Sequence, residues 1–378
     1  MRFIFLIAFT PFVVIPSVYV GIRLYGFLKQ LFPSVKKTVF WVCYLLFPFS
    51  FLISHSLPAS TTAKILSNIG YIYLGVAMYA LLILLFAELI RFILYIFKRL
   101  PQKGEKRRKA HIYVGFIIIT VLAVITVSGI INAYTIDTKN YSIKINKDYS
   151  KENFRIVAVA DTHLGYQIGN AHIKRTVRAI NRQNPDLVVF VGDIFDGSTD
   201  EVSDIIRIKS SLATIKSEYG VFAVLGNHDR FTVELESFFA ESNITLLKDE
   251  SILIDDSFYL AGRNDSNLLT LSRTGRKLLS DILKDADNNK PIIVLDHRPE
   301  EIEAAWENRA DLLLCGHSHR GQLFPVNLIT KMVYANDYGY QKFGDMHMIV
   351  TSGVGFWGPP LRIGTDAEIA VIDIKFGD

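Results

Sequence analysis

The sequence is poor in cysteine. Only two occur in 378 residues, Cys43 inside an apolar run and Cys315 at the end of the run "DLLLC". Two cysteines so far apart, in different kinds of sequence, give no basis for a disulfide framework. Each is more simply a small buried side chain. Because few cysteines are compatible with either side of a membrane, their scarcity does not fix the compartment.

The first 150 residues also lack acidic side chains. They contain four Asp or Glu against 17 Lys or Arg, whereas residues 151–378 contain 33 acidic against 24 basic side chains. An acidic domain is a poor match for a phosphate backbone, which proteins bind through clustered Lys and Arg. The composition therefore argues against a nucleic-acid partner, and it divides the chain into two unlike parts.

The first part contains four apolar runs that approach or exceed the length of about 20 helical residues needed to cross a bilayer. The first run lacks the small-residue cleavage site of a signal peptide, so we expect it to be retained. The second run is the shortest. The sequence therefore predicts an all-α transmembrane region of about four helices over residues 1–133, with spans near Phe3–Leu24, Thr38–Ile53, Ile69–Phe97 and Ile112–Ala133.

The basic residues predict how these spans are oriented. The loops after the first and third runs contain eleven Lys or Arg, whereas the opposite face contains five. Basic loops stay in the cytoplasm and contact anionic lipid, so four spans would place everything after Ala133 outside it. We therefore expect an integral protein of the cell membrane with an extracytoplasmic C-terminal part. If the second run does not span, this assignment fails. Glu88 and Arg91, three residues apart in the third run, are expected to pair.

The second part alternates short apolar runs with helix-like stretches, the pattern of an α/β fold. The polar residues 134–153 are interpreted as a connector, and the domain is predicted to cover residues 154–378. In such folds, ligands bind where neighbouring strands end. The polar residues that follow each apolar run are therefore the first place to look for a site.

Five of six apolar runs end in Asp, Asn or His. The endings read "DTH", "GDIFD", "GNHDR", "DHRPE" and "GHSH", and five of the nine histidines lie in them: His163, His228, His297, His317 and His319. Imidazoles, carboxylates and one amide gathered at one edge are typical of a metal site. Each motif alone is a weak signal, but the ordered set is specific. In "GHSH", an extended backbone would point both histidines the same way.

The ordered set resembles the calcineurin-like metallophosphoesterase superfamily over about residues 154–375. The tail, with "GHSHRGQL" and "SGVGFWGPPLRIG", is similar to the bacterial membrane-attached branch. The resemblance implies a four-layer α/β/β/α sandwich and two divalent metal ions, Mn, Fe or Zn. The metal ligands it implies are Asp161, His163, Asp193, Asn227, His297, His317 and His319.

The same resemblance divides the ligands between two metals. Asp161, His163 and His319 would hold one metal with Asp193, and Asn227, His297 and His317 would hold the other with the same Asp193. A bridging ligand needs two oxygens, and a carboxylate has them. The catalytic residues it implies are His228, as general acid or electrostatic stabiliser, and Asp229, which would orient the imidazole and tune its pKa.

Three further features leave alternatives open. Arg320, where many relatives have glycine, either reaches a phosphate or lies in solvent. Asp196 follows a ligand closely and either supports it or belongs to a turn. The loop Gly353–Arg362, with Phe356 and Trp357, either forms a wall of the cleft or rests on lipid headgroups.

The sequence thus predicts a membrane-anchored binuclear metal-dependent phosphoesterase that hydrolyses phosphate ester or anhydride bonds. The expected partners are membrane lipids and a phosphorylated small-molecule or lipid substrate, with tethering favouring lipid-linked or envelope substrates. One alternative is a transporter or signalling protein in which the phosphoesterase-like domain is regulatory. Another is a metal-binding module without catalysis, which would have no need of a proton donor at His228.

Overall fold

The computed structural model describes residues 2–377 except 59, 102–103, 148, 150, 152, 198, 200–201, 203, 230–231 and 267–274, and it describes residues 2–12 and 55 by their backbone alone. The chain divides into two compact units. A helical unit contains residues 1–130 together with 358–361, and an α/β unit contains residues 131–357 together with 362–378.

The helical unit is built from four long helices: α1 (Arg2–Leu31), α2 (Lys37–Ser56), α3 (Thr61–Ile96) and α4 (Glu105–Tyr134). In the described part of the chain, three stretches are long and apolar enough to cross a membrane: Lys37–Ser54, Thr61–Ile96 and Glu105–Tyr134. The second expected run therefore has the length and apolarity of a span. The first, Phe3–Leu24, lies in α1 but starts among residues described by backbone alone, so the count of four spans stays a prediction.

Close contacts hold α1, α2 and α3 together. An added Cβ at Gly70 of α3 would come within 2.6 Å of the Phe51 backbone in α2, so only glycine permits this approach. Near the other end of α3, the Glu88 carboxylate pairs with Arg91 at 3.2 Å, as expected, and with Arg23 of α1 at 2.6 Å. The charges within the third run therefore satisfy one another.

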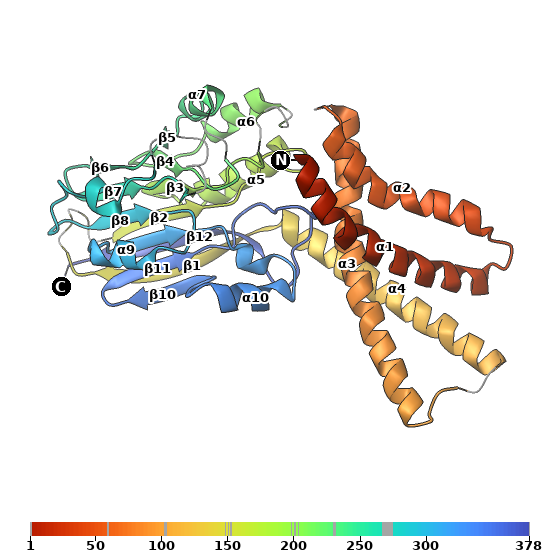
Figure 1. The fold of residues 1–378 in the computed structure, drawn as a ribbon. Coiled ribbons are helices and arrows are strands. Elements are labelled where there is room, and N and C mark those ends of the chain that lie inside the picture. Colours follow the sequence, from red (N-terminus) through yellow and green to blue (C-terminus); the bar gives the residue numbers. More distant parts are fainter. Residues whose placement is uncertain are drawn as a thin grey trace. The chain divides into compact units, whose positions relative to one another are not determined.

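The α/β unit contains two six-stranded sheets (Figure 1). The order of the first sheet is β1 (Ile136–Ile145), β12 (Ala367–Phe376), β2 (Asn153–Val159), β3 (Leu187–Val191), β4 (Val221–Val224) and β5 (Thr245–Leu246). The order of the second is β10 (Gly339–Phe343), β11 (Met346–Val350), β9 (Leu312–Cys315), β8 (Ile292–Leu295), β7 (Phe258–Gly262) and β6 (Glu250–Ile254). In the first sheet β2, β3, β4 and β5 run parallel, and in the second so do β7, β8, β9 and β11.

Alternate side chains of each sheet face opposite layers, as a strand requires. Ile156 and Val189 of the first sheet share a core with Leu295 and Leu314 of the second, so the sheets pack face to face. The outer faces are covered by helices: α5 (Asn170–Asn181), α6 (Ile205–Leu212) and α7 (Val233–Glu241) on the first sheet, and α8 (Leu279–Ile282) and α9 (Ile302–Glu307) on the second. The predicted four-layer α/β/β/α sandwich is confirmed. Two short elements follow β9, η3 (His319–Gly321) and α10 (Val326–Val333).

The expected connector over residues 134–153 is wrong for most of its length. Residues 136–145 form β1, which pairs in parallel with β12 over ten residues. Ile143 and Ile145 are buried in the core between the sheets. The alternation in "YSIKI" marks a strand with one buried face, and it outweighs the polar composition of the segment.

Candidate metal centre

The parallel strands place the polar motifs at one edge of the sandwich. Asp161 follows β2, Asp193 follows β3 and Asn227 follows β4, and these three strands are neighbours in the first sheet. His297 follows β8 and His317 follows β9, which are neighbours in the second sheet. The carboxyl ends of both sheets therefore supply the candidate ligands, as the strand-end rule predicts.

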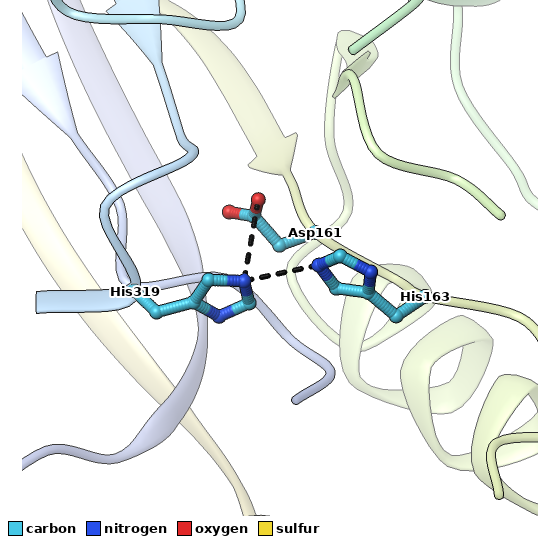
Figure 2. A group of neighbouring side chains, drawn as sticks. All are labelled: Asp161, His163 and His319. Atoms are coloured by element: carbon cyan, nitrogen blue, oxygen red, sulfur yellow. Dashed lines mark hydrogen bonds and ion pairs between the residues drawn. The ribbon is translucent and has the colours of Figure 1, made fainter. Parts of the chain in front are cut away.

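Asp161, His163 and His319 form a first group of potential metal ligands (Figure 2). The Nε2 atoms of His163 and His319 lie 3.0 Å apart, and Nε2 of His319 lies 3.7 Å from Oδ1 of Asp161. All three residues are buried. Each offers one ligand atom within 4.8 Å of the others, which is close enough to hold a single ion.

Asp193, His297 and His317 form a second group of the same kind. Nε2 of His297 lies 3.2 Å from Oδ2 of Asp193. That same oxygen lies 3.8 Å from Nε2 of His163 in the first group. Asp193 therefore connects the two groups, the position that a bridging carboxylate requires.

Five of the candidate ligands have a left-handed backbone, which is uncommon outside glycine. Their φ angles lie between +48° and +70°, and the residues are Asp161, His163, Asp193, His317 and His319. Each such residue costs free energy that the surrounding fold must offset, and such residues cluster at functional sites. The "GHSH" segment is therefore not extended, and its two histidines reach different groups: His317 the second and His319 the first.

Two glycines let the backbone approach the carboxylates. A Cβ at Gly226 would come within 2.2 Å of Oδ1 of Asp193, and a Cβ at Gly316 would come within 2.7 Å of Oδ2 of Asp161. The glycine of "GNHD" is thus required for its missing side chain and not for a positive φ. It also brings the His228 N–H to Asp193, where it donates to Oδ1 at 2.8 Å.

The buried polar atoms of this edge fit divalent cations. In the part of the chain that the structure describes, Nε2 of His297 and Oδ1 of Asn227 are buried and have no hydrogen-bond partner. His297 donates from Nδ1 to the Val191 carbonyl at 2.8 Å, so Nε2 is the ring nitrogen that faces Asp193. Buried lone pairs without donors are costly unless a cation accepts them. The residues present therefore suit two ions with nitrogen and oxygen ligands.

The carboxylates and imidazoles shift one another's pKa values. Burial raises the pKa of Asp161 to about 6, and the charge of Asp193 adds to this rise. Burial would also raise the pKa of Asp193, but His297 outweighs it and holds that pKa below its usual range. Burial lowers the pKa of His317 to about 3 and keeps the imidazole neutral, the form in which it binds metals.

His228 lies beside the first group, and its ring is held by Asp196, for which the sequence left open a supporting role or a place in a turn. Its Nδ1 lies 3.1 Å from Oδ1 of Asp196. Burial lowers the pKa of His228, but the hydrogen bond that its ring donates to Asp196 and the charge of Asp193 outweigh burial and raise the pKa to about 8. The imidazolium form is therefore favoured at neutral pH.

Asp229 does not hold that ring in the way we expected. Its carboxylate accepts from three backbone N–H groups, those of Gly226 at 2.8 Å, Phe195 at 2.8 Å and Ile194 at 3.2 Å. Asp229 thereby ties the loop after β4 to the loop after β3, and its charge adds a smaller rise to the pKa of His228. The orienting contact belongs to Asp196. The second aspartate of "GDIFD" was the available signal.

Arg362 is a residue of the site that sequence reasoning missed. Its side chain is fully buried, and its guanidinium donates to the carbonyls of Ser352, Gly353 and Gly355. One of its nitrogens also lies 3.2 Å from Nδ1 of His319. Arg362 therefore positions both the loop after β11 and a candidate ligand, and its place after "GPPL" gave no sign of this.

Residues 353–357, the first half of the loop Gly353–Arg362, contribute a wall to the site. Phe356 is buried, whereas Trp357 is half exposed, and its ring centroid lies 6.1 Å from that of His228. Gln322 fixes this position, since it accepts from the Trp357 N–H and donates to its carbonyl, both at 2.8 Å. Arg320 is held elsewhere, with its guanidinium 4.3 Å above the ring of Tyr338.

Comparison with known proteins agrees with this geometry. The calcineurin-like phosphoesterase family matches residues 154–321. An uncharacterized metallophosphoesterase from Campylobacter jejuni is 30% identical over 260 residues, a match that covers 68% of each chain. The chain belongs to the calcineurin-like phosphoesterase family. This membership makes it a metal-dependent hydrolase of phosphate esters by class.

Two other relatives share the phosphoesterase domain, and the match covers different shares of their own length. A transmembrane protein with metallophosphoesterase domain from Danio rerio is 30% identical over 273 residues, which span 68% of this chain and 61% of that protein. An uncharacterized metallophosphoesterase from Aquifex aeolicus is 29% identical over 252 residues, 65% of this chain and 94% of that one. The phosphoesterase domain is shared, whereas the rest of the zebrafish protein has no counterpart in the match.

Proposed function

We propose that this chain is a membrane-anchored phosphoesterase with two metal ions that hydrolyses phosphate ester or anhydride bonds of lipid-linked or envelope substrates. The observation that supports it best is the arrangement of six of the seven expected ligands in two groups joined at Asp193, with all but His317 buried. The seventh, Asn227, has a buried amide oxygen without a hydrogen-bond partner among the described residues.

The residues that would hold the ions divide as the two groups do. Asp161, His163 and His319 would hold one ion, and His297 and His317 the other, with Asn227 beside the second and Asp193 shared. When bound, two divalent cations acidify water and offset the charge of the phosphate oxygens. The backbone N–H of His317, 3.1 Å from both oxygens of Asp161, keeps this carboxylate in place.

His228 would protonate the leaving oxygen of the substrate. With Nδ1 bonded to Asp196, its Nε2 is the nitrogen available to a substrate. An imidazole with a pKa near the working pH is an effective general acid, and a positioned acid contributes about 10²–10⁴-fold to rate. The half-exposed Trp357 beside it would pack against the leaving group.

The proposed substrate class and the proposed side of the membrane both rest on the connection of the α/β unit to a candidate membrane span. α4 has the length and apolarity of a membrane span and ends at Tyr134, only two residues before β1 begins at Ile136. A domain joined so closely to a span works near headgroups. The excess of Lys and Arg in the loops after α1 and α3 supports an extracytoplasmic domain, provided that α1 also spans.

Hydrolysis by the full chain tests the chemistry. The detergent-solubilised protein, loaded with Mn²⁺, should cleave nitrophenyl phosphate or bis-nitrophenyl phosphate, and a panel of envelope lipids should then identify the preferred substrate. Elemental analysis should find two metal ions per chain. If the protein binds both ions but cleaves no phosphate ester, the proposal is wrong and the domain is a metal-binding module without catalysis.

Protease accessibility tests the orientation. In intact cells, a protease added outside should cleave the α/β unit if the domain is extracytoplasmic. Protection in intact cells, with cleavage in inverted vesicles, would place the domain in the cytoplasm and reverse the expected topology without affecting the hydrolytic test.

A further inference from the structure

Helix α10 (Val326–Val333) turns its apolar side toward solvent. The exposed fractions of its large side chains are 51% for Leu328, 58% for Ile329, 86% for Met332 and 66% for Val333. These positions recur at intervals of three and four residues and so form one helical stripe. A soluble surface helix would bury such a stripe, so α10 has the opposite orientation.

The polar side of α10 faces the protein. The hydroxyl of Thr330 donates to Oδ2 of Asp337 at 2.7 Å. The backbone of Asn327 lies so close to Gly321 that an added Cβ there would come within 2.3 Å of the Asn327 nitrogen. These contacts fix the rotation of the helix, so the exposure of its apolar stripe is built into the fold.

The exposed apolar side chains are concentrated here. Six of the large hydrophobic side chains that the α/β unit exposes lie within ten residues, and we call them the α10 patch: Phe324, Val326, Leu328, Ile329, Met332 and Val333. Elsewhere on this unit, exposed residues such as Ile206 and Val233 stand singly, which is ordinary. A contiguous apolar patch marks a surface that binds something.

The charge around the patch suits an anionic lipid surface. Residues 151–378 carry an excess of acidic side chains, yet residues 320–336 contain Arg320 and Lys331 and no Asp or Glu, and Asp337, which follows them, is buried. Lys331 is exposed on α10 itself. An apolar helix face with an exposed Lys on the same helix suits the interface of a bilayer that contains anionic lipid.

The tether holds the domain where such a helix can reach lipid. Ala133, at the end of the membrane-length helix α4, is fully buried in the core of the α/β unit, and Tyr134 packs on Phe356 with ring centroids 5.3 Å apart. Along the chain, α4 ends at Tyr134 and β1 begins at Ile136, so one residue lies between the candidate span and the first strand of the domain. The bilayer is therefore the apolar phase that is always within reach of the domain.

The patch also borders the metal centre. α10 begins seven residues after His319, and the ring of Tyr334, directly after the helix, has its centroid 6.1 Å from that of His317. We propose that α10 lies in the membrane interface and delivers lipid-borne phosphate esters to the metal centre. This inference rests on the proposed function for the substrate, but its membrane contact can be tested without any activity.

A fluorescent label tests the contact directly. In a Cys43→Ser background, Met332→Cys of the full chain is labelled with a nitrobenzoxadiazole dye and reconstituted in vesicles of phosphatidylethanolamine and phosphatidylglycerol. Cys315 is buried and does not compete. The emission should shift to the blue and be quenched by doxyl-labelled lipids. The matched control is Val233→Cys in α7, 78% exposed, which should show neither effect.

Two results would overturn the lipid contact. Emission at position 332 equal to that at position 233 would leave α10 in water. A blue shift without lipid quenching would mean that a protein, such as a second copy of the chain, covers the patch.

Kinetics tests the delivery of substrate. Ile329→Glu together with Met332→Glu should slow hydrolysis of a phospholipid ester in vesicles by about tenfold or more. The reason is that α10 would no longer bury these two apolar side chains in the bilayer. Hydrolysis of soluble nitrophenyl phosphate should not change. Val233→Glu, the control, should affect neither reaction. Equal losses on both substrates would contradict delivery, and an inactive wild-type protein would refute the proposed function while the labelling result stands.

Discussion

The two sheets contribute different chemistry to the same centre. The loops after β2 and β3 provide the carboxylates of Asp161, Asp193 and Asp196 together with one imidazole, that of His163. The ligands that the loops after β8 and β9 provide are imidazoles. The carboxylates repel one another, and the charge of Asp193 helps raise the pKa of Asp161. The imidazole of His317 is held neutral by burial.

This difference assigns unequal tasks to the two halves. The loops of the first sheet, the carboxylate half, provide the negative charge that attracts and bridges cations. Without bound cations, this negative charge is poorly balanced. The imidazole half completes the coordination and adds no charge of its own when neutral. Removing a carboxylate should therefore cost more than removing an imidazole, and substitutions on each side test this ranking.

The largest effect is expected at the residue that joins both groups. Asp193→Asn keeps the size of the side chain but removes its charge and one of its two acceptor oxygens. We expect bound metal to fall below one ion per chain and activity to fall by about 10³-fold or more, because both ions lose a ligand. Elemental analysis and nitrophenyl phosphate hydrolysis measure this. A variant that keeps two ions would show that Asp193 does not bridge.

His228 follows β4 of the first sheet and is not an expected metal ligand, so its removal should lower turnover and leave the metal ions bound. His228→Asn should lower the rate by about 10²–10⁴-fold on an alkyl phosphate, whose leaving group needs a proton, and by much less on nitrophenyl phosphate. Two ions should remain bound. Equal losses on both substrates would mean that His228 contributes only its charge to the phosphate.

The pH profile provides an independent test of the same residue. A general acid acts while protonated, so activity should fall as the pH rises through its pKa, about 8 for His228. Bound cations would lower this value, and the alkaline limb should therefore lie at or below pH 8. His228→Asn should abolish the limb. A limb that persists would belong to another group.

The metal ligands were predictable because strand ends constrain them. A polar residue directly after a buried parallel strand has only one edge of the sheet to occupy, so "DTH", "GD", "GNHD" and "GHSH" had to converge. The sequence could not show the backbone turns within these motifs. Consequently the reason given for His317 and His319, an extended segment, was wrong, although the structure places both at the centre.

The residues that hold the ligands were harder to predict. Asp196 and Asp229 have similar positions after a strand, but the expected contact with the His228 ring belongs to Asp196 and not to Asp229, because hydrogen bonds across loops decide which carboxylate meets the ring. Arg362 contacts carbonyls ten residues earlier in the chain, and no local pattern records such a contact. β1 is different, because the alternation of apolar and polar residues in "YSIKI" was visible in the sequence. The polar composition of the segment nevertheless led to the prediction of a connector.

A smaller effect is expected from the imidazole half. His317→Gln should weaken metal binding by about 100-fold, because one neutral ligand is lost while the bridging carboxylate remains. Saturating Mn²⁺ should restore most of the activity, which it should not do for Asp193→Asn. Metal titrations of the two variants side by side measure the difference. If His317→Gln proves as refractory to added metal as Asp193→Asn, the halves are equivalent.

The smallest effect on activity is expected from a buried imidazole outside both halves, whose contribution is to stability. His172 bonds the Val354 carbonyl through Nε2 at 2.8 Å, and burial lowers its pKa to about 4. Since the unfolded chain takes up this proton near pH 6.5, the contribution of His172 is complete above pH 6.5 and is lost as the pH falls toward 4. The loss amounts to about 3 kcal/mol at most. Proteolysis of the solubilised chain between pH 4 and 8 should detect it, and His172→Gln should flatten that part of the profile. If the profile is unchanged in His172→Gln, acid sensitivity comes from the carboxylate half alone.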